Sequence, residues 1–273
     1  MAVLLRDITL GQFFPGNSLL HKTDPRYKII IAMVYIVSLF LAKGVLSYAL
    51  VLVFTFAMII FSGIPLRIVV RGFKALMFII AFTAILNIFW TKGENLIFEY
   101  KFIKIYAEGV TYAVFMILRL LCLLTGSSVL ISYTTSPIAL TYGIEKLLAP
   151  LNLIKVPVHE FSMMMTIALR FIPTLIEETD KIMSAQKARG ADFTSGGIIK
   201  RAKALIPILI PLFVSAFRRA DELAVAMECR CYNGGKGRSK MTKLKTKPLD
   251  IIMLLVFSAF TAGIILLNGI TLF

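Results

Sequence analysis

Apolar residues are gathered into five long runs along the chain, and polar segments lie between them. A helix needs about 20 predominantly apolar residues to cross the hydrocarbon core of a bilayer. Four of the runs are close to this length, and the polar turn over residues 25–28 can extend the first run, which is shorter. The pattern therefore predicts five transmembrane helices, over residues 29–42, 45–62, 73–90, 110–132 and 251–273.

Two further apolar stretches, 161–176 and 205–217, are shorter and are interrupted by arginine or proline. Apolar residues then recur every three or four positions with charged residues between them, which is typical of an amphipathic helix. We expect the first of these long helices to end at Gly190, a natural left-handed cap, and the second to end within 232–235. A shorter helix should precede both, with Ser136 as its N-cap and Pro137 at its first position.

The distribution of charge orients the chain in the membrane. The net charge is +15, the mean hydropathy is +0.85, and eighteen of the 30 Lys and Arg residues lie within 133–250. Five spans place this segment and the basic N-terminal segment on one side, which the positive-inside rule makes cytoplasmic. If 161–176 and 205–217 also spanned the membrane, six basic residues would move to the outside. We therefore prefer five spans to seven.

These features predict an all-α, polytopic protein of the cell membrane, with its N-terminus in the cytoplasm and its C-terminus outside. The membrane domain would comprise residues 1–132 and the final helix, 251–273. Residues 133–250 would form a cytoplasmic domain of about three helices, two of them long. Topology and contacts with anionic lipid account for the positive charge, so we predict a lipid-bilayer environment and no nucleic-acid partner.

No set of residues in the sequence is arranged for catalysis. The pair His159–Glu160 begins like a zinc-protease motif, but the second histidine of that motif is absent because position 163 is Met. The glycines and lysines of 233–240 lack the spacing of a phosphate-binding loop. Cys229 and Cys231 could form half of a soft-metal site, although we favour the interpretation that they only flank an exposed arginine. We predict no enzymatic activity and no metal or cofactor bound by this chain. An intramembrane enzyme is the weakest alternative.

Two features of the apolar segments could serve either packing or function. Arg119 lies near the middle of the fourth predicted span, where a charge is costly and often functional. It could pair with a polar neighbour, face a water-filled cleft or contact a partner. Met163, Met164 and Met165 have flexible side chains that could repack against different partners, although filling a core is the more common role.

An arginine lies in the last turn of each long helix. A cation there stabilises a helix by about 0.3–1 kcal/mol through the helix dipole, which explains either arginine alone. It explains less well why both helices end in the same way, with small residues on each side of the arginine. Small neighbours would let a helix end enter a groove, where the guanidinium could form two hydrogen bonds with a carboxylate. The two candidate contact sites are Ala188, Arg189 and Gly190, and Cys229, Arg230 and Cys231.

Three segments resemble motifs of the transmembrane (T) components of energy-coupling factor transporters. Residues 15–28 contain Ser-x-x-His followed by Asp-Pro-Arg-x-Lys, and residues 169–192 and 218–235 resemble the family's two coupling helices. The first coupling helix ends in the family's Ala-Arg-Gly motif, and the second ends in Cys-Arg-Cys instead. In the N-terminal motif, Asp24 and Pro25 suit the start of a helix, and Arg26 and Lys28 suit the cytoplasmic edge of the membrane.

The resemblance implies a membrane scaffold that catalyses nothing itself. Such a scaffold binds two ABC-type ATPase subunits, which hold the ATP and Mg, through the arginines at positions 189 and 230. It also binds a substrate-binding membrane protein, the S component, and Met163, Met164 and Met165 are candidates for that contact. Closure of the ATPases would drive uptake of vitamins or transition-metal ions. The alternative is a conventional ABC importer permease with its own substrate path, for which the segment 133–250 is unexpectedly long.

Overall fold

The computed structural model describes residues 13–74, 76–91, 93, 95–100, 103–193, 197–234 and 245–270. The chain divides into two compact units. The first, which we call the crossed-helix unit, lies within Glu145–Lys243. The second, which we call the membrane unit, lies within Leu10–Ile144 and Leu244–Phe273.

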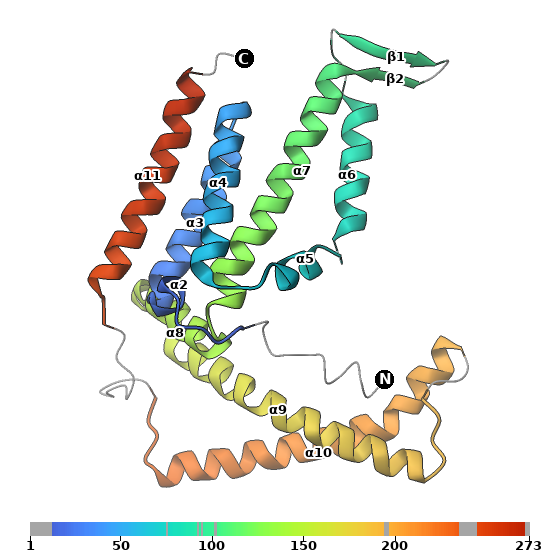
Figure 1. Ribbon diagram of the computed structural model, residues 1–273. Coiled ribbons are helices and arrows are strands. Elements are labelled where there is room, and N and C mark those ends of the chain that lie inside the picture. The colour runs from blue at the N-terminus through green and yellow to red at the C-terminus, as the bar shows by residue number, and fades with distance from the viewer. Residues whose placement is uncertain are drawn as a thin grey trace. The chain divides into compact units, whose positions relative to one another are not determined.

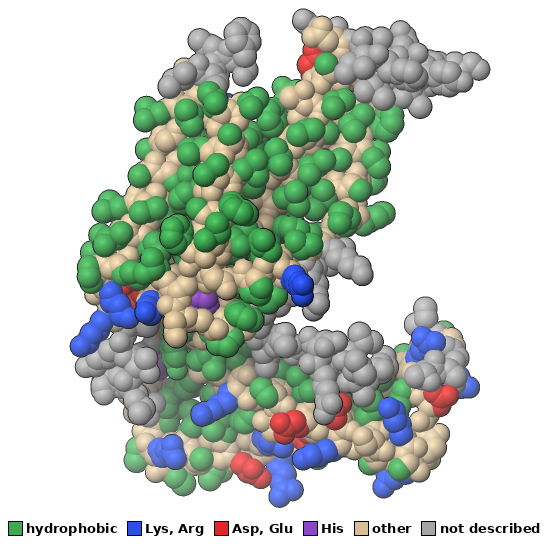
Figure 2. Space-filling model, in the orientation of Figure 1, with side chains coloured by type: hydrophobic (Ala, Val, Ile, Leu, Met, Phe, Trp, Pro, Cys, Tyr) green, Lys and Arg blue, Asp and Glu red, His purple; other side chains and the backbone are tan. Residues whose placement is uncertain are grey.

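The membrane unit is built from long helices that pack side by side (Figure 1). Helix α7 continues as a π-helix, Ser128–Tyr133, and the short helix α2, Leu19–Lys22, precedes the first long helix. Figure 2 shows hydrophobic side chains over the face of this unit that is in view. The long helices are α3 (Pro25–Leu41), α4 (Val45–Ser62), α6 (Met77–Trp90), α7 (Ala107–Ser127) and α11 (Pro248–Ile270).

Three helical segments in the described part of the chain are long and apolar enough to cross a membrane. They are Val45–Ser62, Ala107–Tyr133 and Pro248–Gly269. Helices α3 and α6 stand at the first and third predicted spans and are shorter, with 17 and 14 residues. The prediction of an all-α polytopic membrane protein is confirmed.

The third predicted span, 73–90, began too early. Residues Leu66–Lys74 form a separate helix, α5, and α6 begins at Met77. The Leu76 N–H donates to the Phe73 carbonyl (2.9 Å) in the turn between the two helices. Three of the nine residues of α5 are basic, so it is too polar to continue into hydrocarbon. The segment between the second and third spans, which we expected to be a loop, therefore contains the helix α5.

A two-stranded antiparallel hairpin, which we did not expect, joins α6 to α7 (Figure 1). Its strands are β1, Leu96–Tyr100, and β2, Ile103–Tyr106. Both strands are rich in isoleucine and aromatic residues, which favour extended backbone. These residue types could have indicated strands from the sequence, but they lie between two longer apolar runs.

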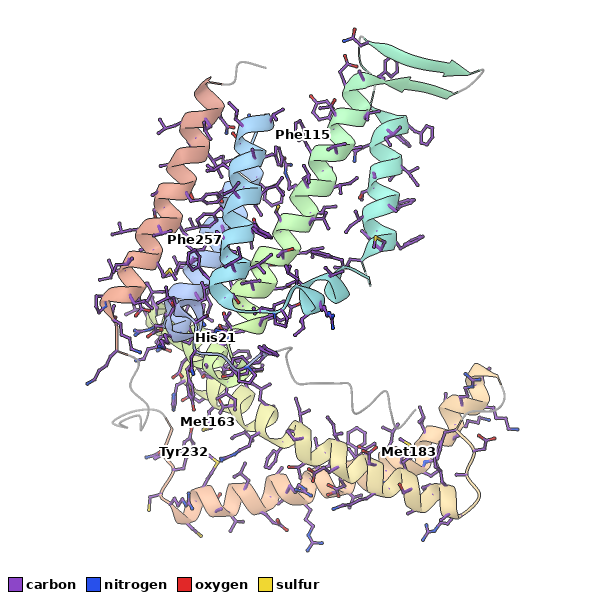
Figure 3. All side chains as sticks on the ribbon, in the orientation of Figure 1. His21, Phe115, Met163, Met183, Tyr232 and Phe257 are labelled. Carbon is purple, nitrogen blue, oxygen red and sulfur yellow. The ribbon has the colours of Figure 1, made fainter. Side chains whose placement is uncertain are left out.

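Tyr35 lies at the centre of the membrane unit with no exposed surface. Its hydroxyl is 2.9 Å from the Cys122 carbonyl and 2.8 Å from the Thr55 hydroxyl, which links α3 to α7 and α4. Gly126 of α7 permits this approach, because a Cβ atom at that position would collide with the Tyr35 ring. Phe257, labelled in Figure 3, packs edge-on against the same ring from α11.

In the crossed-helix unit, two helices of 31 and 32 residues cross and run in opposite directions (Figure 1). They are α9, Val158–Ala188, and α10, Ile198–Cys229. Met183, labelled in Figure 3, packs with Phe193 and Ile208 in the small core at the crossing. Figure 2 shows that acidic and basic side chains are frequent on this unit. Each predicted amphipathic segment is therefore one continuous helix, even though both contain proline.

The start of α9 is held by a carboxylate. Glu145, near the end of helix α8 (Pro137–Leu148), accepts a hydrogen bond from the Ser162 hydroxyl (3.0 Å). Its second oxygen lies 3.0 Å from Nδ1 of His159. A 3-10 segment, Ala149–Ile154, lies between the two helices. The predicted short helix is confirmed, and the Ser136 hydroxyl accepts from the Ala139 N–H (3.3 Å) as an N-cap should.

Candidate functional site

Helix α9 ends in a hydrogen-bonded cap with Arg189 as the C-cap residue. The next residue, Gly190, has φ +87°, and its N–H donates to the Lys187 carbonyl (2.9 Å). The Ala191 N–H donates to the Gln186 carbonyl (3.0 Å). This pair of bonds is the Schellman motif, which satisfies the last carbonyls of a helix. The predicted end at Gly190 and its left-handed conformation are confirmed.

Helix α10 ends in the same motif, with Arg230 as its C-cap. The Cys231 N–H donates to the Glu228 carbonyl (2.8 Å), and the Tyr232 N–H donates to the Met227 carbonyl (3.0 Å). Cys231 has φ +54° and so takes the left-handed position that Gly190 takes in α9.

Our prediction that α10 ends within 232–235 placed its end too late. We took the Tyr-Asn-Gly-Gly segment as the stop because glycine readily adopts positive φ. The chain turns three residues before the first of these glycines, at a residue with a side chain. No property of cysteine would have indicated this from the sequence.

Both arginines are exposed, as are the residues on either side of them. Within the part of the chain that the structure describes, neither guanidinium has an ion-pair partner. Because α9 and α10 run in opposite directions, the two arginines lie at opposite ends of the crossed pair (Figure 1). The crossed-helix unit thus offers two similar helix ends, each with one exposed guanidinium.

The N-terminal motif begins with a compact turn around His21. Nε2 of His21 lies 2.8 Å from the Phe14 carbonyl and therefore donates to it, because a carbonyl oxygen only accepts. In the neutral ring Nδ1 then accepts from the Ser18 hydroxyl, at 2.7 Å. Ser18 is also the N-cap of α2. Both ring nitrogens of His21 are thus hydrogen-bonded, one to Ser18 within the motif and one to Phe14 just before it.

Asp24 caps α3, and Pro25 is its first residue, as predicted. The Asp24 carboxylate accepts from the Arg26 N–H (2.9 Å), from Nε of Arg26 (3.1 Å) and from Nη2 of Arg26 (2.8 Å). Burial alone would raise the pKa of Asp24, but the hydrogen bonds from Arg26, together with the positive charges of Arg26 and Lys247, outweigh burial and lower this pKa below its usual value.

Lys28, which we expected at the cytoplasmic edge of the membrane, is buried within the membrane unit. Its side chain is buried, with 2% of the residue exposed, and Nζ donates to the Thr134 carbonyl (2.8 Å) and the Thr135 hydroxyl (3.0 Å). These residues follow the π-helix directly. The lysine therefore ties the start of α3 to the end of that π-helix.

Asp250 completes this junction, and we did not identify it from the sequence. It has no exposed surface and accepts from the Asp24 N–H (2.8 Å) and the Lys247 N–H (2.7 Å). The second bond is half of a capping box, in which an acid at the third helical position reaches back to the residue before the helix. The sequence feature that could have indicated this role is an acidic residue two positions after Pro248, immediately before the last apolar run.

Arg119 contacts the end of α3. Its Nη2 donates to the carbonyl of Ala42, the C-cap of that helix, at 3.3 Å. Its guanidinium carbon lies 5.7 Å from the ring centres of both Phe40 and Tyr48, which is within the range of cation–π attraction. The chain therefore supplies Arg119 with a polar neighbour, which was one of the three possibilities that we considered, and with two aromatic rings.

The crossed-helix unit exposes an unusual amount of apolar side chain. Met164 and Met165 of α9 are exposed, and Met163, labelled in Figure 3, is partly buried. Contiguous exposed apolar residues of this kind mark interaction surfaces. On α10 the exposed large apolar residues between its two ends are Leu205, Ile206, Leu209, Ile210, Phe213, Val214 and Phe217, and Ile199 and Val225 are exposed nearer the ends.

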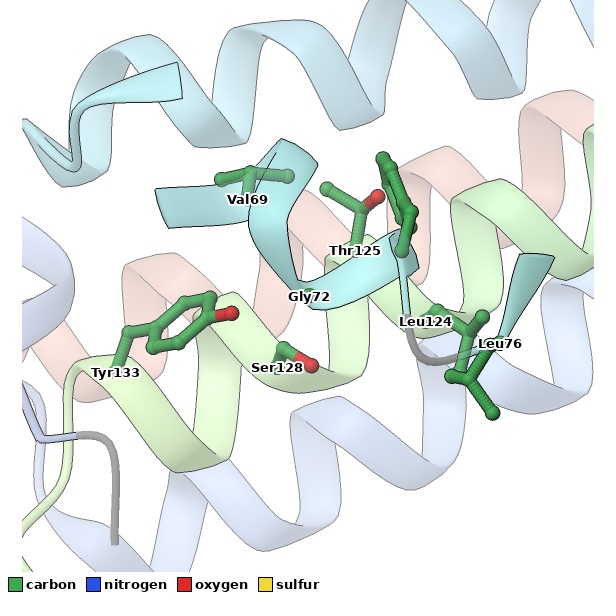
Figure 4. A pocket seen from close by; sticks show the side chains of 8 residues that line it. Val69, Gly72, Leu76, Leu124, Thr125, Ser128 and Tyr133 are labelled. Carbon is green, nitrogen blue, oxygen red and sulfur yellow. The ribbon is translucent and has the colours of Figure 1, made fainter. Parts of the chain in front are cut away.

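A cavity of about 130 Å³ lies between α5 and α7 in the membrane unit (Figure 4). None of its eight lining residues is charged, and its polar side chains are the hydroxyls of Thr125, Ser128 and Tyr133. Among the described residues there is no group of three or more His, Cys, Asp or Glu side chains that could hold a metal ion. The features with distinctive chemistry are therefore the ends of α9 and α10, and the buried contacts of Lys28 and Asp250 around the start of α3.

The chain is similar to known proteins over almost its whole length. A family model described as CbiQ, cobalt transport protein, matches residues 16–242. The energy-coupling factor transporter transmembrane protein EcfT of Ruminiclostridium cellulolyticum is 52% identical over 265 residues, which are 97% of this chain and 98% of that protein. EcfT of Clostridium kluyveri is 54% identical over 250 residues (91% and 92%), and EcfT of Bacillus subtilis is 46% identical over 259 residues (94% and 97%).

Proposed function

The chain belongs to the CbiQ family, which contains the transmembrane proteins of energy-coupling factor transporters, and we propose that it couples two ABC-type ATPase subunits to a substrate-binding S component. The proposal assigns the ATP and Mg to the ATPases and no catalytic step to this chain. It places the protein in the cell membrane, with the N-terminus and the crossed-helix unit in the cytoplasm and the C-terminus outside.

The matched ends of α9 and α10 carry this proposal. Arg189 and Arg230 have the same C-cap position, the same hydrogen-bonded turn after them and the same exposure. Two similar contacts at opposite ends of a crossed pair suit two similar ATPase subunits. Each guanidinium would enter a groove of one ATPase and form two hydrogen bonds with a carboxylate there.

The exposed apolar face of α10 supports the contact with the S component. Phe213 and Phe217 are 60% and 68% exposed, although a bulky apolar residue of a soluble surface is usually covered. An apolar membrane protein is a suitable occupant, and Met164 and Met165 would adapt to more than one such partner. Movement of the ATPases would then reach the S component through the two long helices. The substrate would be a vitamin or a transition-metal ion, and the S component would determine which.

The decisive experiment is to purify the tagged chain from its own cells and measure the ATPases that remain bound. Truncating one partner of a buried, hydrogen-bonded charge pair costs about 2–5 kcal/mol. Arg189→Ala and Arg230→Ala should therefore each weaken ATPase binding at least about 30-fold, and the double variant should lose uptake. Arg→Lys keeps the charge but not the planar fork, so it should restore binding only in part.

Lys187→Ala is the matched control, because Lys187 is an exposed cation on the same last turn of α9. It should bind the ATPases normally. Wild-type uptake in the double arginine variant would refute the proposal. Transport by the chain and ATPases without any S component would instead favour a conventional importer permease.

A further inference from the structure

The two matched helix ends differ in one chemical respect. Arg189 lies between Ala188 and Gly190, which carry no reactive group, whereas Arg230 lies between two cysteines. Both of these thiols, on Cys229 and Cys231, are free and exposed. The remaining cysteine, Cys122, is buried in the membrane unit. The exposed thiols of the chain's three cysteines are therefore both beside one of the two proposed ATPase contacts.

The backbone does not favour a cysteine at this position. Cys231 has φ +54°, a conformation that is disfavoured for a residue with a Cβ atom and that glycine adopts freely. The equivalent position in α9 is a glycine, so the turn itself needs no side chain. Cysteine is thus present at an exposed helix end although the backbone conformation there is unfavourable for it. This indicates that the side chain has a function.

We propose that the end of α10 is a thiol-modification site, where exchange with a low-molecular-weight disulfide prevents Arg230 from docking and so makes one ATPase contact sensitive to redox state. The inference rests on the proposed function, since it assumes that Arg230 docks. It does not require any change at Arg189.

The reaction is thiol–disulfide exchange. The thiolate of Cys229 or Cys231 attacks one sulfur of the disulfide R–S–S–R, whose S–S bond breaks as a new S–S bond to the protein forms. The second sulfur leaves as R–S⁻ and takes up a proton from water. The protein sulfur is oxidised and the departing sulfur is reduced, so no other oxidant is needed. A dithiol reductant reverses the step.

The consequence follows from the shape of the helix end. A group attached to the residue next to Arg230 lies where the wall of the ATPase groove would otherwise contact the helix end. The guanidinium can then no longer be buried in that groove. Docking is then lost much as it is when the arginine is truncated, while α9 keeps its own contact. The complex would be held through one ATPase contact instead of two.

The test uses the purified full-length chain and the ATPase subunits that copurify with it. The chain is incubated with glutathione disulfide, freed of reagent and then mixed with the ATPases, so that thiols of the ATPases are never exposed to the reagent. Mass analysis of peptides should locate glutathione on Cys229 or Cys231, binding should fall at least about tenfold, and dithiothreitol should restore it. The Cys229→Ser/Cys231→Ser variant should bind equally well with and without treatment.

Cys122→Ser is the control for the buried thiol and should respond like the wild-type chain. Three results would overturn the proposal: both exposed thiols stay unmodified, they are modified without loss of binding, or the serine variant loses binding equally. Arg230→Ala separates this failure from failure of the proposed function. If the untreated Arg230→Ala chain binds the ATPases normally, the docking contact itself is wrong, whatever the thiols do.

Discussion

Gly190 and Cys231 occupy equivalent positions, each as the first residue after the arginine that caps a long helix. Their φ angles are +87° and +54°, and each donates its N–H to the carbonyl three residues earlier. The same turn is therefore built once from the residue that favours it and once from a residue that does not. This difference predicts opposite effects of substitution at the two ends.

Gly190→Ala should destabilise the end of α9 by about 1 kcal/mol, because a Cβ atom is disfavoured at positive φ. Cys231→Gly should stabilise the end of α10 by a smaller amount, since the greater freedom of glycine in the unfolded chain offsets part of the gain. Hydrogen exchange of the amides of residues 190–191 and 231–232 measures both effects locally. Faster exchange at residues 231–232 in Cys231→Gly would contradict the argument.

Gly126→Ala should disrupt the membrane unit, because the new methyl group collides with the buried Tyr35 ring. Overpacking of a core costs typically about 1–3 kcal/mol. Gly263→Ala in α11 is the matched control, since a Cβ atom there meets the Leu50 side chain at an ordinary 3.6 Å. Thermal unfolding in detergent should show a clear loss of stability for the first variant and little change for the second.

Lys28→Met should destabilise the junction between α3 and the π-helix. The variant fills similar space but leaves the Thr134 carbonyl buried without its donor, which costs about 1–3 kcal/mol. Arg26→Met, which removes a partly exposed side chain, should cost less. Equal melting temperatures of the Lys28→Met and wild-type chains would show that the buried ammonium contributes nothing net.

Asp250→Ala should destabilise the start of α11, because it removes the acceptor of the Asp24 and Lys247 N–H groups at once. Asp250→Asn keeps one oxygen and should retain part of the stability. The order of stability should be wild type, then Asn, then Ala, measured by the fraction of monodisperse protein after heating. A chain in which Asn and Ala are equivalent would mean that only one of the two bonds matters.

Arg219 and Glu178 link α10 to α9 through a 2.9 Å ion pair whose side chains are 36% and 23% exposed. An exposed pair of this kind is worth about 0.2–1 kcal/mol. A double-mutant cycle with Arg219→Ala and Glu178→Ala should give a coupling energy in that range. The pair Arg218–Glu222, on one helix and more exposed, is the control and should give less. A coupling energy of zero for the first pair would show that this ion pair does not stabilise the packing of α9 against α10.

Features that depend on neighbours in the sequence were predictable from it. The apolar runs, the N-cap Asp24 with Pro25 and the left-handed Gly190 all reflect local preferences of the backbone and of each side chain. The membrane class of the protein followed from the apolar runs, because a long apolar helix can cross hydrocarbon with all of its backbone hydrogen bonds satisfied internally. The arginines at both helix ends were also visible as a pattern.

Tertiary structure decided which polar groups meet across the fold. Whether Lys28 faced water or the Thr134 carbonyl depended on a residue 106 positions away. The contact of Asp250 with the Asp24 N–H joins residues that are 226 positions apart. Arg119 found its partner at the end of another helix for the same reason. Cys231 entered a conformation that its own preferences oppose, because the turn after α10 required it. A side chain's local preferences are written in the sequence, but its burial and its hydrogen-bond partners exist only once distant segments have packed together.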